Sequence, residues 1–101
     1  MELREGWSFD DETGAASGPV RPFQLASKVV CDRVTVRRLK GRDMKVAAEL
    51  GDGVSATFKL ISRLTGLQVA DVYEMDADDI GYISEIIGFF TGGGRVSGGQ
   101  S

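Results

Sequence analysis

The spacing of the apolar residues changes at Gly41. Before it, apolar and polar residues alternate along Val29–Val36, and a shorter apolar run precedes them. Alternation of this kind predicts strands, so we expect a β-hairpin over residues 22–39. Its favoured connection is residues 26–28, and a second bend at residues 32–33 stays open. From Gly41 onward the apolar residues recur every three to four positions, which predicts helices.

Gly51-Asp52-Gly53 and Gly66 divide the helical part of the chain. Glycines at such positions stop one helix before the next begins. Asp76 occupies the expected N-cap of the last helix, where the dipole also favours the acids that follow it. The expected helices cover residues 42–50, 54–65, about 69–73 and 77–90. The fold class that follows is α+β, mainly α: an N-terminal β-hairpin, then a compact bundle of three to four short helices, with flexible termini.

The length of 101 residues fits one domain. Residues 1–18 hold acids, glycine and serine around two aromatic residues, and we expect a flexible N-terminal arm there. Residues 91–101 are glycine-rich and are predicted to form a disordered tail. The single globular domain is therefore expected over residues 19–90, with the hairpin at 22–39 and the helices at 42–90.

The composition lacks most residues on which catalytic and metal sites depend. The chain has no histidine, no asparagine and one cysteine, Cys31, so we expect no enzyme, no cofactor and no disulfide framework. Asp76, Asp78 and Asp79 resemble a metal or acid–base cluster, but their place at a helix start favours capping. Residues 51–56 fit a dinucleotide-binding pattern formally, yet they join two helices, which favours a helix stop followed by a start.

The charges are divided along the chain. Residues 28–45 contain seven bases and two acids, whereas residues 71–85 contain six acids and no base. Two solvated faces with internal complementarity are the favoured interpretation, although either run could steer a partner. The net charge of −3 argues against nucleic acid as a partner. No apolar run approaches the ~18 residues that span a bilayer, so we expect no membrane partner and a cytoplasmic location.

The last helix carries more apolar residues than one buried face requires. They form two stripes: Ile80, Ile83, Ile87 and Phe90, and beside them Tyr82, Ile86 and Phe89. The surplus predicts a surface for a partner, although the second stripe could instead complete the core or a self-association surface. Two arginines at the end of the hairpin are further candidates, with solvated strand-edge charges as the alternative. The candidate partner-binding residues are Tyr82, Ile86, Phe89, Phe90, Arg37 and Arg38.

Four motifs follow one another in a characteristic order. They are Val34–Leu39, Gly41–Lys45, Phe58–Leu67 and Val72–Ile80. Together they resemble the tail assembly chaperone family of tailed phages and prophages, over about residues 23–90. The order and spacing of the motifs carry the resemblance, since each motif alone is short.

The resemblance implies a protein that binds the tape measure protein and keeps it soluble during tail morphogenesis, in the cytoplasm of the bacterial host. It implies no catalytic residues, and it leaves the tail tube protein and self-association open as further contacts. Two other functions fit the residues: a small structural tail or connector protein of the virion, and a small DNA-binding regulator.

Overall fold

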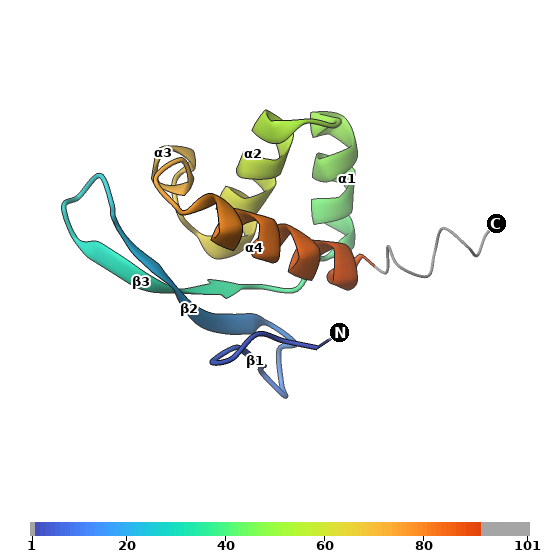
Figure 1. Cartoon of the computed structure of the whole chain (residues 1–101). Helices are drawn as coiled ribbons and strands as arrows, with labels where there is room; N and C mark the ends of the chain where they lie inside the picture. The colour runs from blue at the N-terminus through green and yellow to red at the C-terminus, as the bar shows by residue number, and fades with distance from the viewer. Residues whose placement is uncertain (1, 92–101) are drawn as a thin grey trace.

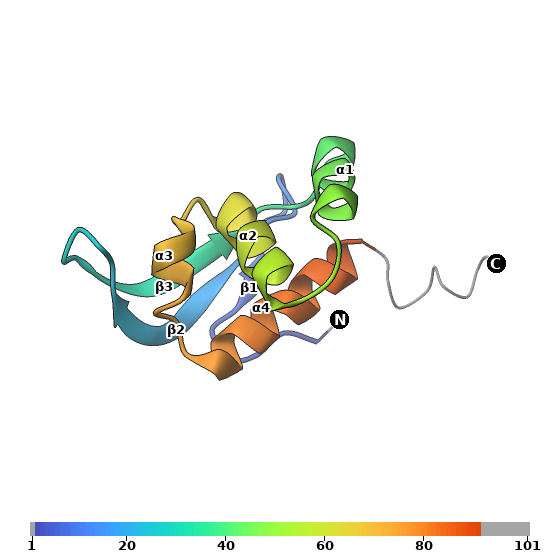
Figure 2. The same cartoon turned by 90° about the horizontal axis from the view of Figure 1, so that it is seen from above.

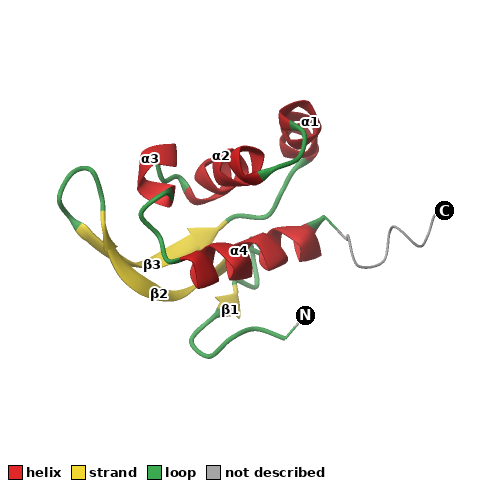
Figure 3. Ribbon diagram, turned by 45° about the horizontal axis from the view of Figure 1, so that its top comes forward, coloured by secondary structure: helices red, strands yellow, loops and turns green. Residues whose placement is uncertain are grey.

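A three-stranded antiparallel sheet, in the order β1-β2-β3, forms one layer of the fold (Figure 1). Three of the four helices lie over one face of β2 and β3, and the first helix lies beyond the end of β3 (Figure 3). The computed structural model describes residues 2–91. Its elements are β1 (Ser8–Phe9), β2 (Ala16–Gln24), β3 (Val30–Val36), α1 (Gly41–Leu50), α2 (Val54–Thr65), α3 (Val69–Val72) and α4 (Ala77–Phe90).

The expected α+β class is confirmed, with one correction. The sheet has a third strand, β1, which pairs with the start of β2, so the N-terminal half is more than a hairpin. The helices also pack on the sheet as well as on one another: α2 contacts β3, and α4 contacts β2. The sheet therefore supplies one wall of the core, and the helices do not form a separate bundle.

The hairpin of β2 and β3 projects beyond the helices in two perpendicular views (Figures 1 and 2). Its turn is closed by two hydrogen bonds of 2.8 Å, from Leu25 N–H to the Val29 carbonyl and from Lys28 N–H to the Leu25 carbonyl. Lys28 has a φ of 76°, a left-handed conformation that is uncommon outside glycine. The connection at residues 26–28 is thus confirmed. Residues 32–33 lie within β3, so no second bend occurs there.

The expected flexible arm at residues 1–18 is wrong for most of its length. Trp7 is only 7% exposed, and β2 already begins at Ala16, which is fully buried. The indole packs so closely on Gly18 that a Cβ there would overlap its ring. The indole N–H also donates a hydrogen bond of 3.0 Å to the Pro19 carbonyl. A large aromatic side chain anchors this polar segment, which composition alone does not reveal.

The edge of β2 beyond β1 is closed by side chains and prolines instead of a strand. Pro19 and Pro22 have no N–H to offer a neighbour. The backbone N–H of Arg21 donates to Asp79 of α4 at 2.8 Å. Just past the strand, the Ala26 N–H donates to Asp71 of α3, also at 2.8 Å. Two buried carboxylates therefore cap the backbone at this side of the hairpin.

The helix boundaries follow the predicted signals. Gly51 and Gly53 separate α1 from α2, and both have positive φ, of 78° and 110°. Gly66 ends α2 in the left-handed conformation. The Asp76 side chain accepts a hydrogen bond of 2.8 Å from the Asp78 N–H, which confirms the N-cap of α4. Of the predicted tail at residues 91–101, only Thr91, the C-cap of α4, lies within the described residues.

The core lies between the sheet and the helices. Its fully buried side chains come from β3, α2, α3 and α4 and meet the inner face of β2. They include Val36, Ile61, Val72, Ile83 and Ile86.

Candidate functional site

Both predicted apolar stripes of helix α4 contribute side chains to the core. Ile83 and Ile86 are fully buried, and Tyr82 and Ile87 are each 7% exposed. Tyr82 and Ile86, which were candidates for a partner surface, therefore lie in the core. The alternative interpretation, that the second stripe completes the core, describes these two residues correctly.

The apolar surface that remains on α4 lies at its C-terminal end. Phe89 is 44% exposed and Phe90 is half-buried. Phe9 of β1 packs against both, with ring centroids 5.7 Å from Phe89 and 6.1 Å from Phe90. We refer to Phe9, Phe89 and Phe90 as the aromatic cluster. It brings together two predicted site residues and one residue from the segment expected to be flexible.

Arg38 lies at the border of the aromatic cluster. Its guanidinium carbon lies 5.7 Å from the centroid of the Phe90 ring, within the range of a cation–π contact. The aliphatic part of its side chain passes Gly14 in the β1–β2 connection. The structure therefore places Arg38 over Phe90, which in turn packs against Phe89. It leaves an exposed cation beside the exposed aromatic surface.

Arg37 points elsewhere and forms part of a buried ion-pair network. Both of its terminal nitrogens donate to Asp43, at 2.7 and 2.9 Å. Arg63 of α2 donates to the same carboxylate at 2.6 Å, and the Lys40 N–H donates at 2.8 Å. Asp43 is fully buried. The hydrogen bonds from Arg37, more than any other contact, hold the pKa of Asp43 far below its ordinary value, although burial alone would raise it.

This network fixes α1 to the rest of the fold. Asp43 is the only residue of α1 that is buried. Its carboxylate joins the chain just after β3 to α2 and also satisfies a backbone N–H at the start of α1. Arg37 is therefore structural in this conformation, and Arg38 is the arginine that faces the aromatic cluster.

The acids at the start of α4 pair with N-terminal arginines. Arg4 contacts Asp79 at 2.7 Å and Asp78 at 3.2 Å, and Arg21 contacts Asp76 at 2.7 Å. Asp79 is almost completely buried. Internal complementarity was expected between the basic and acidic runs. Among residues 2–91 the aspartates of α4 instead find their ion-pair partners before residue 28.

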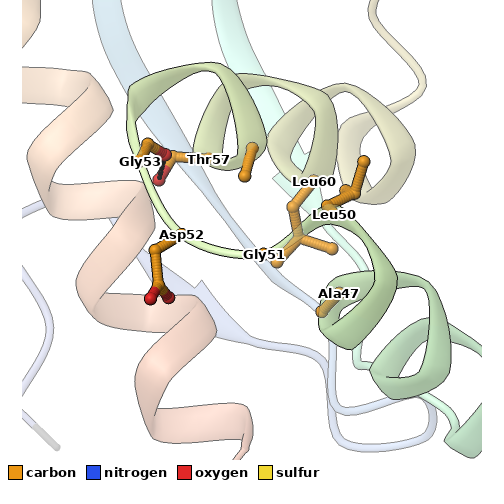
Figure 4. A pocket seen from close by; sticks show the side chains of 8 residues that line it. Ala47, Leu50, Gly51, Asp52, Gly53, Thr57 and Leu60 are labelled. Carbon is orange, nitrogen blue, oxygen red and sulfur yellow. Dashed lines mark hydrogen bonds between the residues drawn. The ribbon is translucent and has the colours of Figure 1, made fainter.

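A small hollow lies between α1 and α2 (Figure 4). Its volume is about 150 Å³. Ala47 and Leu50 of α1 face Leu60 of α2, and the glycine-rich connection closes one end (Figure 4). The residues of the dinucleotide-like pattern therefore join two helices, as predicted. Asp52 is the one titratable side chain among the eight lining residues, so the hollow is not lined by a paired acid and base for chemistry.

Other exposed apolar side chains are scattered. Val29 and Val30 lie at the projecting hairpin, Met44 on α1 and Val54 at the start of α2. Tyr73 is 57% exposed and packs edge-on against Phe58, with centroids 5.1 Å apart. Single exposed apolar residues are normal on protein surfaces, whereas three adjoining rings form a contiguous patch. The aromatic cluster is therefore the best candidate site.

Within residues 2–91, no group of three or more acids or cysteines is arranged to hold a metal ion. No helix in that part of the chain has the length and apolar character needed to cross a membrane. Asp76 is occupied as a helix cap, and its neighbours Asp78 and Asp79 accept the ion pairs described above.

Phe9 is the member of the cluster that sequence reasoning missed. It lies in a segment whose glycines, acids and serines predicted disorder, and no periodic pattern links it to α4. The alternation of Trp7, Ser8 and Phe9 was the available signal. In a strand, residues two positions apart point to the same side, so a buried Trp7 would place Phe9 on the buried side as well.

The family profile described as "Phage tail assembly chaperone proteins, E, or 41 or 14" matches residues 19–92. The matched residues extend from β2 to just beyond α4 and make up well over half of the chain. No curated protein and no solved structure matches this chain. The profile match confirms the resemblance carried by the four motifs. The chain therefore belongs to the family of phage tail assembly chaperone proteins.

Proposed function

We propose that this chain binds the tape measure protein of its phage and keeps it soluble in the bacterial cytoplasm while the tail is built. The observation that carries the proposal is the family match over residues 19–92, which establishes a tail assembly role. The proposed activity is binding alone, without covalent chemistry.

The aromatic cluster supports a binding activity of this kind. A tape measure protein is, by the family resemblance, a long helical polypeptide that aggregates when unprotected. An apolar helix face is best covered by large, rigid apolar side chains, because aromatic rings bury much surface with few rotatable bonds. Phe89 offers such a ring at the surface; Phe90 packs beside it on α4, and Phe9 of β1 covers part of it.

Arg38 places a positive charge at the border of the aromatic cluster. We refer to the proposed partner, the tape measure protein, as the client. A cation beside an aromatic ring can pair with an acid that flanks an apolar stripe on a helix of the client. Such a pair at the rim contributes more to orientation than to affinity, because it stays solvated. We therefore propose Phe89 as the main contact and Arg38 as an orienting contact.

The test is co-expression of the chain with the tape measure protein of the same phage. We expect the soluble fraction of the tape measure protein to rise and a complex to be recovered by size-exclusion chromatography. Phe89→Ala should lower the recovered complex about tenfold, because a central aromatic contact contributes about 1–2 kcal/mol or more. Tyr73→Ala removes a comparably exposed aromatic residue outside the cluster and serves as the matched control.

Two results would contradict the proposal. One is a tape measure protein that stays insoluble in the presence of the wild-type chain. The other is an equal loss of complex in Phe89→Ala and Tyr73→Ala, which would show that the aromatic cluster contributes no more to binding than another exposed aromatic residue. Mass spectrometry of purified phage particles separates a chaperone, which should be absent from them, from a structural protein of the virion.

A further inference from the structure

We propose that the N-terminal strap, defined as Glu2–Phe9, occupies the client-binding face of α4 and is displaced when the client binds. This inference rests on the proposed function and names the surface and the kind of partner involved. The surface is the second stripe of α4 together with the groove over Gly18. The partner is an apolar helical segment that carries a large aromatic or branched anchor residue.

The strap contacts the second stripe of α4 at both of its ends. At the first turns, the Arg4 N–H donates to the Tyr82 hydroxyl at 2.8 Å and the Arg4 guanidinium lies 4.3 Å from the Tyr82 ring centroid. Trp7 packs edge-on against the same ring, with centroids 5.2 Å apart. At the last turn, Phe9 packs on Phe89. The strap therefore covers the spacing that the face of a client helix would cover.

The fit between the strap and α4 is incomplete. Within residues 2–91 a hollow of about 460 Å³ lies between them, lined by Glu2 and Arg4 on one side and by Gly81 and Glu85 on the other. A Cβ at Gly81 would meet no atom. Gly81 and Glu85 are both exposed, so this hollow is open to water and the strap does not seal this side of α4.

The attachments of the strap are also limited in number. Strand β1 has two residues and pairs with β2 only through Ser8↔Ser17 and Phe9↔Ala16. The ion pair from Arg4 to Asp78 is exposed on both sides, and such pairs contribute little and weaken with salt. Gly6 and Gly14 have φ of 86° and 75°, conformations in which glycine is free of strain. The stronger attachments are the burial of Trp7 and the 2.7 Å ion pair from Arg4 to the buried Asp79.

Release of the strap leaves no buried charge without a partner. Asp79 would lose Arg4 but keep the hydrogen bond from the Arg21 N–H, and water could reach its other oxygen. The space vacated by the indole would lie over Gly18, where no side chain interferes. An aromatic or branched side chain of the client can fill that space and replace the apolar contacts of Trp7. An exchange of similar contacts is thermodynamically close to balanced, which permits competition.

The extent of the family match agrees with this division of roles. It begins at residue 19, so Glu2–Phe9 lies outside the matched residues, whereas the whole of α4 lies within them. The α4 part of the binding face thus lies in the region that defines the family, whereas the strap that covers it lies outside that region.

The chain contains one tryptophan, so Trp7 itself reports on the strap. The experiment titrates a tryptophan-free apolar helical peptide from the tape measure protein into the full chain. Fluorescence anisotropy of a label on the peptide measures binding, and the emission of Trp7 measures displacement. We expect the Trp7 emission to shift to longer wavelength in step with binding, because the indole moves from the core into water.

A reversible lock provides the second test. In a Cys31→Ser background, Glu2→Cys and Glu85→Cys place two thiols around the hollow between the strap and α4, where both native side chains are exposed. A short cleavable bis-maleimide with an internal disulfide then ties the strap to α4. We expect the locked chain to bind the peptide at least tenfold more weakly than the same sample after reduction. Each single-cysteine variant treated with the same reagent is the control.

The outcomes separate the two proposals. If no peptide binds to the unlocked chain, the proposed function fails and this inference fails with it. If the peptide binds while the Trp7 emission stays unchanged, or if locked and released chains bind equally, the strap is not displaced and only this inference is overturned. Arg4→Gln weakens the strap without opening the core, so it should raise the apparent affinity about fivefold. A lower affinity would show that the strap is part of the binding surface.

Discussion

Asp43→Asn should be among the most destabilising single-atom changes in this fold. The carboxylate is fully buried and accepts hydrogen bonds from Arg37, Arg63 and the Lys40 backbone. An asparagine amide keeps the shape but loses the charge, and its NH₂ group would face arginine donors. Two cations would then lie beside a neutral group, and α1 would lose the one buried residue that holds it to α2.

The size of the effect follows from how far the two arginines are exposed. Removing one partner of a fully buried ion pair costs about 3–5 kcal/mol. The side chains of Arg37 and Arg63 are 38% and 36% exposed, so water can compensate them in part. We therefore expect a loss of about 2–3 kcal/mol in the free energy of unfolding. For a domain of this size, that corresponds to a fall of about 10–20 °C in Tm.

The pH dependence gives this prediction a second, independent signature. The pKa of Asp43 is depressed in the folded state, so its stabilising contribution is complete above the ordinary aspartate pKa of about 4. The contribution is lost as the pH falls below that value, because the Asp43 carboxylate is then protonated in the unfolded chain but stays ionised in the folded chain. The difference in stability between wild type and Asp43→Asn should therefore shrink from pH 7 towards pH 2.5.

Urea denaturation at a series of pH values, followed by circular dichroism, measures both quantities. Asp52→Asn is the matched control: Asp52 is exposed in the α1–α2 connection and forms no ion pair among residues 2–91. Its effect should stay within about 0.5 kcal/mol. A difference below about 1 kcal/mol at pH 7 for Asp43→Asn, or one that does not change with pH, would refute the reasoning.

Three further substitutions test the fold. Gly18→Ala should cost about 1–3 kcal/mol and shift the Trp7 emission, because the new methyl group overlaps the indole; an unshifted spectrum would contradict the packing. Asp76→Ala should lower the urea midpoint by the equivalent of about 1 kcal/mol through loss of the N-cap of α4, and an unchanged midpoint would argue against the cap. Lys28→Gly should raise stability by about 1 kcal/mol, because Lys28 has a left-handed backbone; a loss would show that its side chain contributes more than the backbone strain.

The helices could be predicted from the sequence almost to the residue. Each boundary has a local chemical cause: the glycines at 51, 53 and 66 adopt positive φ, and Asp76 caps the helix that follows it. Local signals of this kind need no knowledge of the tertiary structure. The hairpin turn at residues 26–28 was found in the same way, from the alternation on either side of it.

The N-terminal strand and the use of the second stripe of α4 could not be predicted in this way. The second stripe of α4 is covered through contacts between segments more than 70 residues apart, such as the hydrogen bond from the Arg4 N–H to the Tyr82 hydroxyl. The polar composition around Trp7 indicates disorder when each residue is considered alone. What orders the segment is one indole that fits over Gly18, and complementarity of shape has no periodic signature.

The candidate site was predicted in part for a related reason. Phe89, Phe90 and Arg38 do adjoin one another, because the end of the hairpin meets the end of α4. Arg37 differs from its neighbour Arg38 only in which side of the chain it faces, and the buried Asp43 decides that. Two adjacent arginines are equivalent in a sequence, whereas the fold gives one to the interior and the other to the surface.

The closed edge of β2 has a consequence for the behaviour of the protein at high concentration. An open strand edge offers unpaired backbone groups on which other chains can build fibrils. Here Pro19 and Pro22 remove donors, and Asp79 and Asp71 occupy the N–H groups of Arg21 and Ala26. A protein proposed to work beside an aggregation-prone polypeptide thus carries two carboxylates that block this edge of its sheet against cross-β pairing.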